Sequence, residues 1–271
     1  MTSDRDDLVY QQAVRYAAEL RELYEQNRIG AEELRARRGK AERVNGVLER
    51  QSMRAVFQPI RNLATGELAG YEALTRVEAE PRQPPNRWFE DAAEVGLGIE
   101  LELAAVRGAI AEFERLPKDV FLSMNISPRS IDAPWLMEVL GRIPLARVVV
   151  EVTEHAPVDD YELLGARLRP FREGGGRLAV DDAGAGFASL RHILSLAPDV
   201  IKLDTTITRN IDRDRARRAL ASALISFAGE MGMAIVAEGI ETQSELAALR
   251  DLGVKLGQGY HLGRPEPLPN G

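Results

Sequence analysis

The sequence predicts an α/β fold, a TIM-like β/α barrel with an antiparallel first strand, preceded by an N-terminal helical segment. Three observations lead to this prediction. Short apolar runs bounded by turn-forming residues alternate with helical patterns from residue 55 onward, which is typical of buried strands joined by helices. The runs number eight, as many strands as close such a barrel. Polar residues end these runs, and β/α barrels keep their active sites at the carboxyl ends of the strands.

Length and composition bound the possible functions. A chain of 271 residues with 45% hydrophobic composition is long enough for one barrel-sized domain plus an extension. The net charge of -7 argues against a nucleic-acid polymer as partner. The absence of cysteine excludes thiolate chemistry and disulfides, and it agrees with a reducing cytoplasm. No stretch reaches the roughly 18 apolar residues of a membrane span and the N-terminus lacks a leader pattern, so we expect a cytoplasmic protein.

Residues 1–50 form the first predicted domain, a helical segment rich in Arg, Glu, Ala and Leu. Its apolar residues give a heptad seam of about two repeats, interrupted near Asn27 and Gly30, and two heptads are too few to be stable alone. Two interpretations stay open: a helix packed on its own domain, or a coiled coil that dimerises the protein and receives an upstream signalling partner. The seam consists of Val9, Ala13, Tyr16, Leu20 and Leu23.

Residues 51–271 form the second predicted domain. The runs at 55–60 and 68–76 flank a turn at 62–66, so we expect the first two strands to form a hairpin. An open doubly wound sheet is the main alternative fold, but the sequence has no glycine-rich phosphate loop of the expected form. Further strands are predicted near 121–124, 148–152, 178–180, 200–203, 234–237 and 255–256. Helices are predicted near 88–116, 135–143, 161–173, 187–196, 216–231 and 243–252.

The polar residues at the strand ends are rich in carboxylates. If the strands close into a barrel, these charges converge on one small volume, and divalent cations are then needed to hold them together. Carboxylate and amide oxygens suit Mg²⁺ or Mn²⁺, and the three histidines are not placed as a cluster, so zinc is not expected. The residues are Glu72, Asn125, Glu151, Asp181, Asp182, Lys202, Glu238 and Gln258.

The segments around these residues resemble, in order, the motifs of the EAL-type cyclic di-GMP phosphodiesterases of bacterial signalling. Each motif alone is weak, but eight in the right order over residues 57–265 are specific. The resemblance implies hydrolysis of cyclic di-GMP to linear pGpG by a metal-activated water, with one or two Mg²⁺ or Mn²⁺ ions, in a homodimer. The segments are FQPI, YEALTR, MNIS, EVTE, DDAGAG, VIKLD, VAEGIE and GQGYHLGRP.

The resemblance also implies roles for single residues. One metal ion, or a bridged pair, is held by Glu72, Asn125, Glu151 and Asp181, while Asp182 belongs to the second ion. Lys202 lies beside the metals and orients or polarises the attacking water, with a buried salt bridge as its alternative role. Glu238 acts near that water as metal ligand or general base. The catalytic residues are thus Glu72, Lys202 and Glu238. Substrate contacts are expected from Gln58, Leu74, Arg76 and Gln258, and Glu154 steadies the loop after the Asp pair.

The loop after strand five departs from the commonest family form, DDFGTG. Ala183 replaces the Phe and Ala185 the Thr, which removes no metal ligand but bears on loop order, dimer coupling and turnover rate. Two other functions remain open. A catalytically silent domain would act as a cyclic di-GMP receptor or a protein-interaction module and would bind without metal. A hydrolase of another phosphodiester would cleave generic substrates faster than the cyclic dinucleotide.

Overall fold

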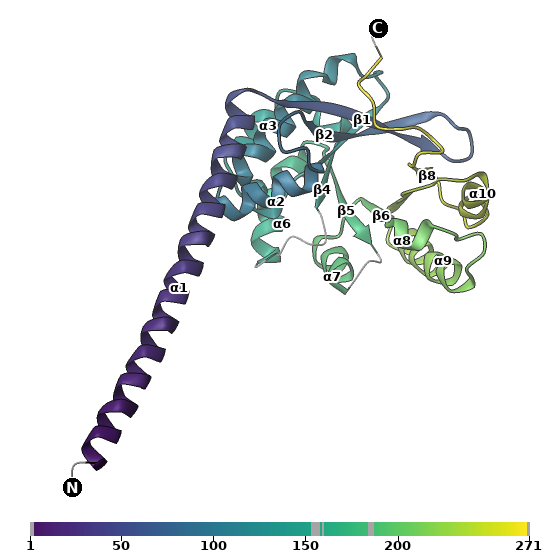
Figure 1. Ribbon diagram of the computed structural model, residues 1–271. Helices are drawn as coiled ribbons and strands as arrows, with labels where there is room; N and C mark the ends of the chain where they lie inside the picture. The colour runs from purple at the N-terminus through teal and green to yellow at the C-terminus, as the bar shows by residue number, and fades with distance from the viewer. Residues whose placement is uncertain (1–2, 153–157, 159, 184–186, 270–271) are drawn as a thin grey trace.

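The computed structural model describes residues 3–152, 158, 160–183 and 187–269 and shows a closed barrel of eight strands with helices around it (Figure 1). The strands follow one another around the barrel in chain order, and β8 closes it against β1. Neighbouring strands are parallel except that β1 runs antiparallel to both β2 and β8. The predicted barrel with an antiparallel first strand is confirmed.

The strands lie where the sequence predicts them. β1 (Met53–Asn62) and β2 (Leu68–Val77) form the expected hairpin, and the side chain of Asn62 accepts hydrogen bonds from the N–H groups of Ala64 and Thr65 in its turn. The other strands are β3 (Phe121–Asn125), β4 (Val148–Val152), β5 (Arg177–Ala183), β6 (Val200–Leu203), β7 (Ala234–Ala237) and β8 (Leu256–Gly257).

One predicted helix, near residues 88–116, is wrong in its extent. The chain forms α2 (Pro85–Val95) and α3 (Gly98–Ala111), separated at Gly96, whose φ of 82° is the left-handed conformation that ends helices. The remaining helices are α4 (Pro128–Ile131), α5 (Trp135–Leu140), α6 (Tyr161–Glu173), α7 (Phe187–Leu196), α8 (Thr205–Thr208), α9 (Arg215–Glu230) and α10 (Gln243–Asp251), with 3₁₀ turns η1 (Phe113–Arg115) and η2 (Leu145–Arg147).

Helix α1 (Ser3–Glu49) is continuous, and it passes through Asn27 and Gly30 where the apolar spacing breaks. A single glycine inside a helix costs only about 1 kcal/mol, which a helix of this length tolerates. Figure 1 shows most of α1 extending away from the barrel. No helix among the residues described above is both long and apolar enough to cross a membrane.

The last turns of α1 pack against the barrel domain. Val44 and Val47 are fully buried in a cluster with Trp88 of α2 and Leu101 of α3. Beside this cluster, Lys40 Nζ lies 2.9 Å from Asp91 Oδ1 on α2. The end of α1 is therefore held by apolar burial together with an ion pair.

The interior of the barrel below the strand ends contains an apolar layer. Along each strand, alternate side chains point inward, so the residue two positions before a polar residue lies directly beneath it. Val149 lies beneath Glu151 in this way, and Val200 beneath Lys202. This layer lies beneath the polar residues and consists of Ile60, Val149, Ala179, Val200 and Val236.

Candidate functional site at the carboxyl ends of the strands

The polar residues predicted at the strand ends meet at one end of the barrel. Because the parallel strands all finish at this end, neighbouring strands each bring one or two side chains to the same place. Four of these side chains, those of Glu72, Glu151, Asp181 and Lys202, are buried although they are charged, which is rare unless such groups are paired. β2 contributes Glu72, β3 Asn125, β4 Glu151, β5 Asp181 and Asp182, and β6 Lys202, while Glu238 and Gln258 directly follow β7 and β8.

Lys202 lies at the centre of this cluster. Its Nζ is 2.7 Å from Glu151, 2.9 Å from Glu238, 3.3 Å from Asp181 and 3.4 Å from Glu72. The lysine side chain is only 2% exposed, so it is desolvated and depends on these carboxylates for its charge partners. The structure thus brings together carboxylates from four strands or strand ends around one ammonium.

Two side-chain amides cross-link the carboxylates. Gln258 Nε2 donates to Glu72 Oε2 at 2.7 Å and to Glu238 Oε1 at 2.8 Å, while Asn125 Nδ2 donates to Glu72 Oε1 at 2.9 Å. Both oxygens of Glu72 therefore accept a hydrogen bond from an amide. These bonds fix the carboxylates of Glu72 and Glu238 relative to each other.

Burial dominates the acid–base behaviour of the cluster. Burial raises the pKa of Glu151 to about 8, with the charges of Glu72 and Asp181 adding to the rise and Lys202 opposing it. Burial likewise raises the pKa of Glu238 well above its usual value. For Glu72 burial acts in the same direction, but Lys202 and two side-chain amides outweigh it and the pKa of Glu72 is lowered. One lysine does not balance these carboxylates, so added positive charge would stabilise the site.

The oxygen atoms of the cluster fit divalent cations. Glu72, Glu151 and Asp181 each offer one oxygen within 4.8 Å of the others, and so do Asp181, Asp182 and Glu238. Asp181 belongs to both groups, as a carboxylate shared between two ions would. All the donors are hard oxygens of the kind that Mg²⁺ and Mn²⁺ prefer. The residues present therefore fit one or two such ions.

The local backbone explains how adjacent aspartates reach the same site. Asp182 has a φ of 56°, in the left-handed region that Asp adopts more readily than most residues. The pairing of β5 with β6 shifts register between Val180 and Ala183, and the N–H of Asp182 donates to Asp181 Oδ1 at 2.9 Å. Because the chain turns between the two aspartates, both carboxylates can face the cluster instead of opposite faces of the strand.

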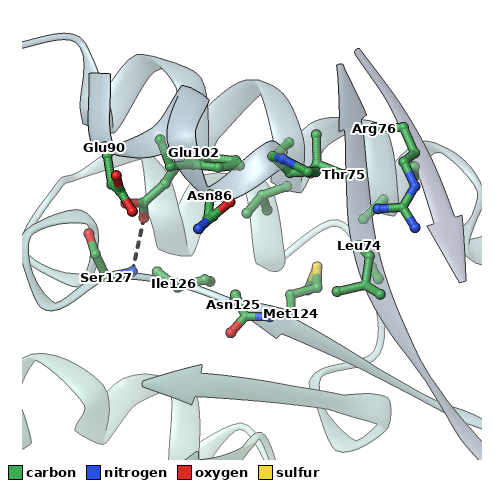
Figure 2. Close-up of a pocket in the computed structure, with 17 residues that line it drawn as sticks. Leu74, Thr75, Arg76, Asn86, Glu90, Glu102, Met124, Asn125, Ile126 and Ser127 are labelled. Atoms are coloured by element: carbon green, nitrogen blue, oxygen red, sulfur yellow. Dashed lines mark hydrogen bonds between the residues drawn. The ribbon is translucent and has the colours of Figure 1, made fainter. Parts of the chain in front are cut away.

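A cavity of about 440 Å³ lies beside the cluster, between β2, β3 and helices α2 and α3 (Figure 2). Leu74 and Arg76, two of the predicted substrate contacts, line it together with Asn125. The others lie elsewhere: Gln58 stands opposite Glu72 in the β1–β2 ladder and donates to the carbonyl of Gly263 at 3.2 Å, and Gln258 lies among the carboxylates.

The helices supply the opposite wall of this cavity. Figure 2 shows Asn86 and Glu90 from α2 and Glu102 from α3 facing the strand residues, and Glu102 accepts a hydrogen bond from the N–H of Ser127 at 2.9 Å. The cavity has an apolar lining with a few polar groups, which is typical of small-molecule sites. The sequence did not predict this wall, because it depends on the break between α2 and α3.

Sequence reasoning also missed Ser123. Its Oγ donates to Glu151 Oε1 at 2.5 Å, and the serine is 1% exposed. The available signal was position, since Ser123 precedes Asn125 by two residues on one strand and must share its face. Two predicted features, Glu154 and the loop at 184–186, lie outside the described residues.

Comparisons with known proteins agree with this geometry. The family model of the EAL domain matches residues 41–265. An uncharacterized signaling protein of Caulobacter vibrioides is 32% identical over 78% of this chain and 27% of its own length. The cyclic di-GMP phosphodiesterase PdeB of Shewanella oneidensis is 28% identical over 84% of this chain and 28% of its own length. The chain thus spans little more than a quarter of these relatives.

Solved structures share the fold. The PaMucR phosphodiesterase in complex with cyclic di-GMP superposes with a TM-score of 0.75 at 25% identity, covering 84% of this chain and 98% of that one. Klebsiella pneumoniae BlrP1, in a complex with calcium and cyclic di-GMP, superposes with a TM-score of 0.71 at 28% identity, covering 79% and 56%. The barrel, the order of its polar strand ends and the match over most of the sequence agree, and the chain belongs to the EAL domain family.

Proposed function

We propose that this protein is a metal-dependent phosphodiesterase that hydrolyses cyclic di-GMP to linear pGpG. One observation carries the proposal: the carboxylates of Glu72, Glu151, Asp181 and Glu238 all contact Lys202 in one largely buried cluster. Such a concentration of oxygen ligands is costly for a fold and is typical of a functional site. The phosphodiesterase named among the relatives and the cyclic di-GMP held by two similar structures support the choice of substrate.

Divalent cations, which we take to be Mg²⁺ or Mn²⁺, would make a bound water more acidic and offset the charge of the phosphate. We assign them the two carboxylate groups that share Asp181, with Asn125 adding an amide oxygen to the first group. In the reaction, the water oxygen bonds to phosphorus, the P–O3′ bond breaks, and the 3′ oxygen takes a proton. The product then keeps a 5′-phosphate, which makes it pGpG.

The residues of the chain divide this work by position. Glu238 lies at the edge of the cluster, 2.8 Å from Gln258 and 2.9 Å from Lys202, and we assign it the proton of the attacking water. Lys202 lies among the four carboxylates, and we assign it the polarisation of that water. Glu72 completes the catalytic group because the amides of Asn125 and Gln258 fix both of its oxygens.

The cavity next to Asn125 is assigned to the nucleotide. Its volume of about 440 Å³ lies within the range of sites that bind small molecules. We place a guanine base against Leu74 and the apolar wall, with the guanidinium of Arg76 on a phosphate. Gln58, which lies opposite Glu72 and outside this cavity, is assigned to the part of the nucleotide nearer the cluster. An apolar cavity contiguous with a metal-ligand cluster is what a cyclic dinucleotide requires.

The test is incubation of the purified protein with cyclic di-GMP in the presence of Mg²⁺, Mn²⁺ or EDTA, with the nucleotides resolved by chromatography. We expect pGpG only with metal, and none from the Glu72→Gln variant. Intact nucleotide in every sample, together with calorimetric binding in EDTA, would identify a receptor instead. Faster cleavage of bis(p-nitrophenyl) phosphate than of cyclic di-GMP would identify a different hydrolase.

We further propose a cytoplasmic homodimer in which α1 forms a coiled coil and receives an upstream partner. Tyr16 of the predicted heptad seam is 66% exposed, and Leu34, which falls on the extension of that seam, is 69% exposed. A projecting helix gains most of its stability from packing, which a second copy would supply. Light scattering should show a dimer for the protein and a monomer for a Leu20→Asp, Leu23→Asp variant. A dimer in both would place the interface elsewhere.

A further inference from the structure

Two donors from different strands hold the two oxygens of Glu151. Ser123 Oγ donates to Oε1 at 2.5 Å from β3, and Lys202 Nζ contacts Oε2 at 2.7 Å from β6. Glu151 and Ser123 are each only 1% exposed, so water does not compete with either contact. The carboxylate is thus fixed in the plane that these two donors define.

The torsion at the end of a glutamate side chain is broad, so a buried carboxylate without such contacts could rotate with little resistance. Ser123 lies opposite Glu72 in the β2–β3 ladder and Val149 in the β3–β4 ladder, which directs its side chain into the barrel below Asn125. A serine hydroxyl adds no charge to the cluster, unlike Lys202. It can therefore orient Glu151 without reducing the negative charge available to a cation.

We propose that Ser123 is a positioning residue for metal binding. By holding Oε1, it fixes the orientation of the Glu151 carboxylate. In this orientation Glu151, Glu72 and Asp181 each offer one oxygen, and the three oxygens lie within 4.8 Å of one another. Hydrogen-bond partners behind metal ligands typically control affinity by about 10- to 100-fold. The inference rests on the proposed function for its effect on turnover, but its effect on cation affinity is measured without substrate.

The test is calorimetric titration of the metal-free protein with Mn²⁺. Ser123→Ala removes the hydrogen bond, and we expect the Kd for Mn²⁺ to rise by about 10- to 100-fold. Ser123→Thr keeps the hydroxyl and should bind Mn²⁺ like the wild type. A cavity of about 30 Å³ borders Ser123, Glu151 and Lys202 and gives the added methyl group a place to lie.

Ser130→Ala is the matched control for the loss of a buried hydroxyl. Ser130 is fully buried in α4, and its Oγ has no hydrogen-bond partner among the described residues. This variant should bind Mn²⁺ with the wild-type Kd. Melting temperatures of the metal-free variants, measured in parallel, separate a change of affinity from a general loss of stability.

The proposal is overturned if Ser123→Ala binds Mn²⁺ as the wild type does, if Ser130→Ala weakens binding equally, or if Ser123→Thr fails to restore it. The outcome is separable from the proposed function. If Ser123→Ala weakens Mn²⁺ binding as expected but the wild type releases no pGpG, the hydrolase is refuted and this inference stands. If the wild type releases pGpG but Ser123→Ala binds Mn²⁺ with the same Kd, this inference is refuted and the hydrolase stands.

Discussion

The ammonium of Lys202 and the carboxylate of Glu151 form a buried ion pair, with Nζ and Oε2 2.7 Å apart and side chains that are 2% and 1% exposed. Three further carboxylates surround the same ammonium. A buried cation in this position neutralises part of the charge that the barrel carries at this end. The metal-free protein therefore depends on Lys202 for part of its stability.

Lys202→Met should destabilise the metal-free protein by about 3–5 kcal/mol, because it leaves buried carboxylates without their cation. Mn²⁺ should restore much of this loss, since it supplies positive charge to the same oxygens. Urea unfolding in EDTA and in Mn²⁺ measures both effects. Equal stability of variant and wild type in EDTA would contradict the role of Lys202 as counter-ion.

Glu238→Gln should lower kcat by about 10²- to 10⁴-fold, because an amide cannot accept the proton of the attacking water. The amide keeps the shape of the side chain, so the fold should be unchanged. Release of pGpG measures kcat, and circular dichroism checks the fold. Glu72→Ala and Asn125→Ala should also abolish turnover in folded protein, and unfolding of all three variants would refute the placement of the site.

Arg76→Ala should weaken binding of cyclic di-GMP by about 1.5–3 kcal/mol, the usual value of a hydrogen bond to a charged group. Arg54 is the matched control because it is paired with Arg76 in the β1–β2 ladder, while its side chain is 51% exposed and pairs with Glu78. Arg54→Ala should leave binding unchanged. Calorimetry with cyclic di-GMP distinguishes the two, and equal losses would mean that Arg76 does not contact the phosphate.

Glu245→Gln should make the unfolding free energy less dependent on pH. The Glu245 carboxylate accepts hydrogen bonds from the N–H groups of Asn210, Glu241 and Thr242 at 2.9–3.0 Å. Burial alone would raise the pKa of Glu245, but these bonds hold it below its usual value. At pH 7 the free energy of unfolding of the wild type should therefore exceed that of the Glu245→Gln variant by about 1–3 kcal/mol.

The sign of this pH effect follows from the lowered pKa. The stabilisation is complete above the pKa of an unfolded glutamate, about 4.3, and is lost as the pH falls through the lower folded value. Urea unfolding of both proteins between pH 7 and pH 3 should show the difference shrinking toward acid. A difference that stays constant over this pH range would contradict the prediction.

The sequence predicts the barrel and its carboxylates well because buried parallel strands leave a clear pattern. In VVVE and LAVDD, the only polar residues are those at the strand ends, and the structure brings them together. Ser123 escaped notice because its position two residues before Asn125 predicts only the face that it shares, while its role depends on Glu151 of the next strand.

The helical side of the site was less predictable. α2 and α3 share one continuous apolar pattern, and only the left-handed conformation of Gly96 separates them. Residues of both helices line the cavity beside β2, so the cavity depends on how the two helices pack and not on a local sequence pattern. The role of the exposed part of α1 was left open for a similar reason, because the spacing of its apolar residues does not identify what packs against them.

The reversed direction of β1 decides where the N-terminal helix meets the barrel. Met53, at the start of β1, pairs with Val77 at the end of β2, so the chain enters the barrel at the rim that carries the carboxylates. With a parallel first strand, α1 would arrive at the opposite rim. Instead its last turns lie on α2, whose other face supplies Asn86 and Glu90 to the cavity. The thickness of a single helix therefore separates α1 from the cavity that we assign to the nucleotide.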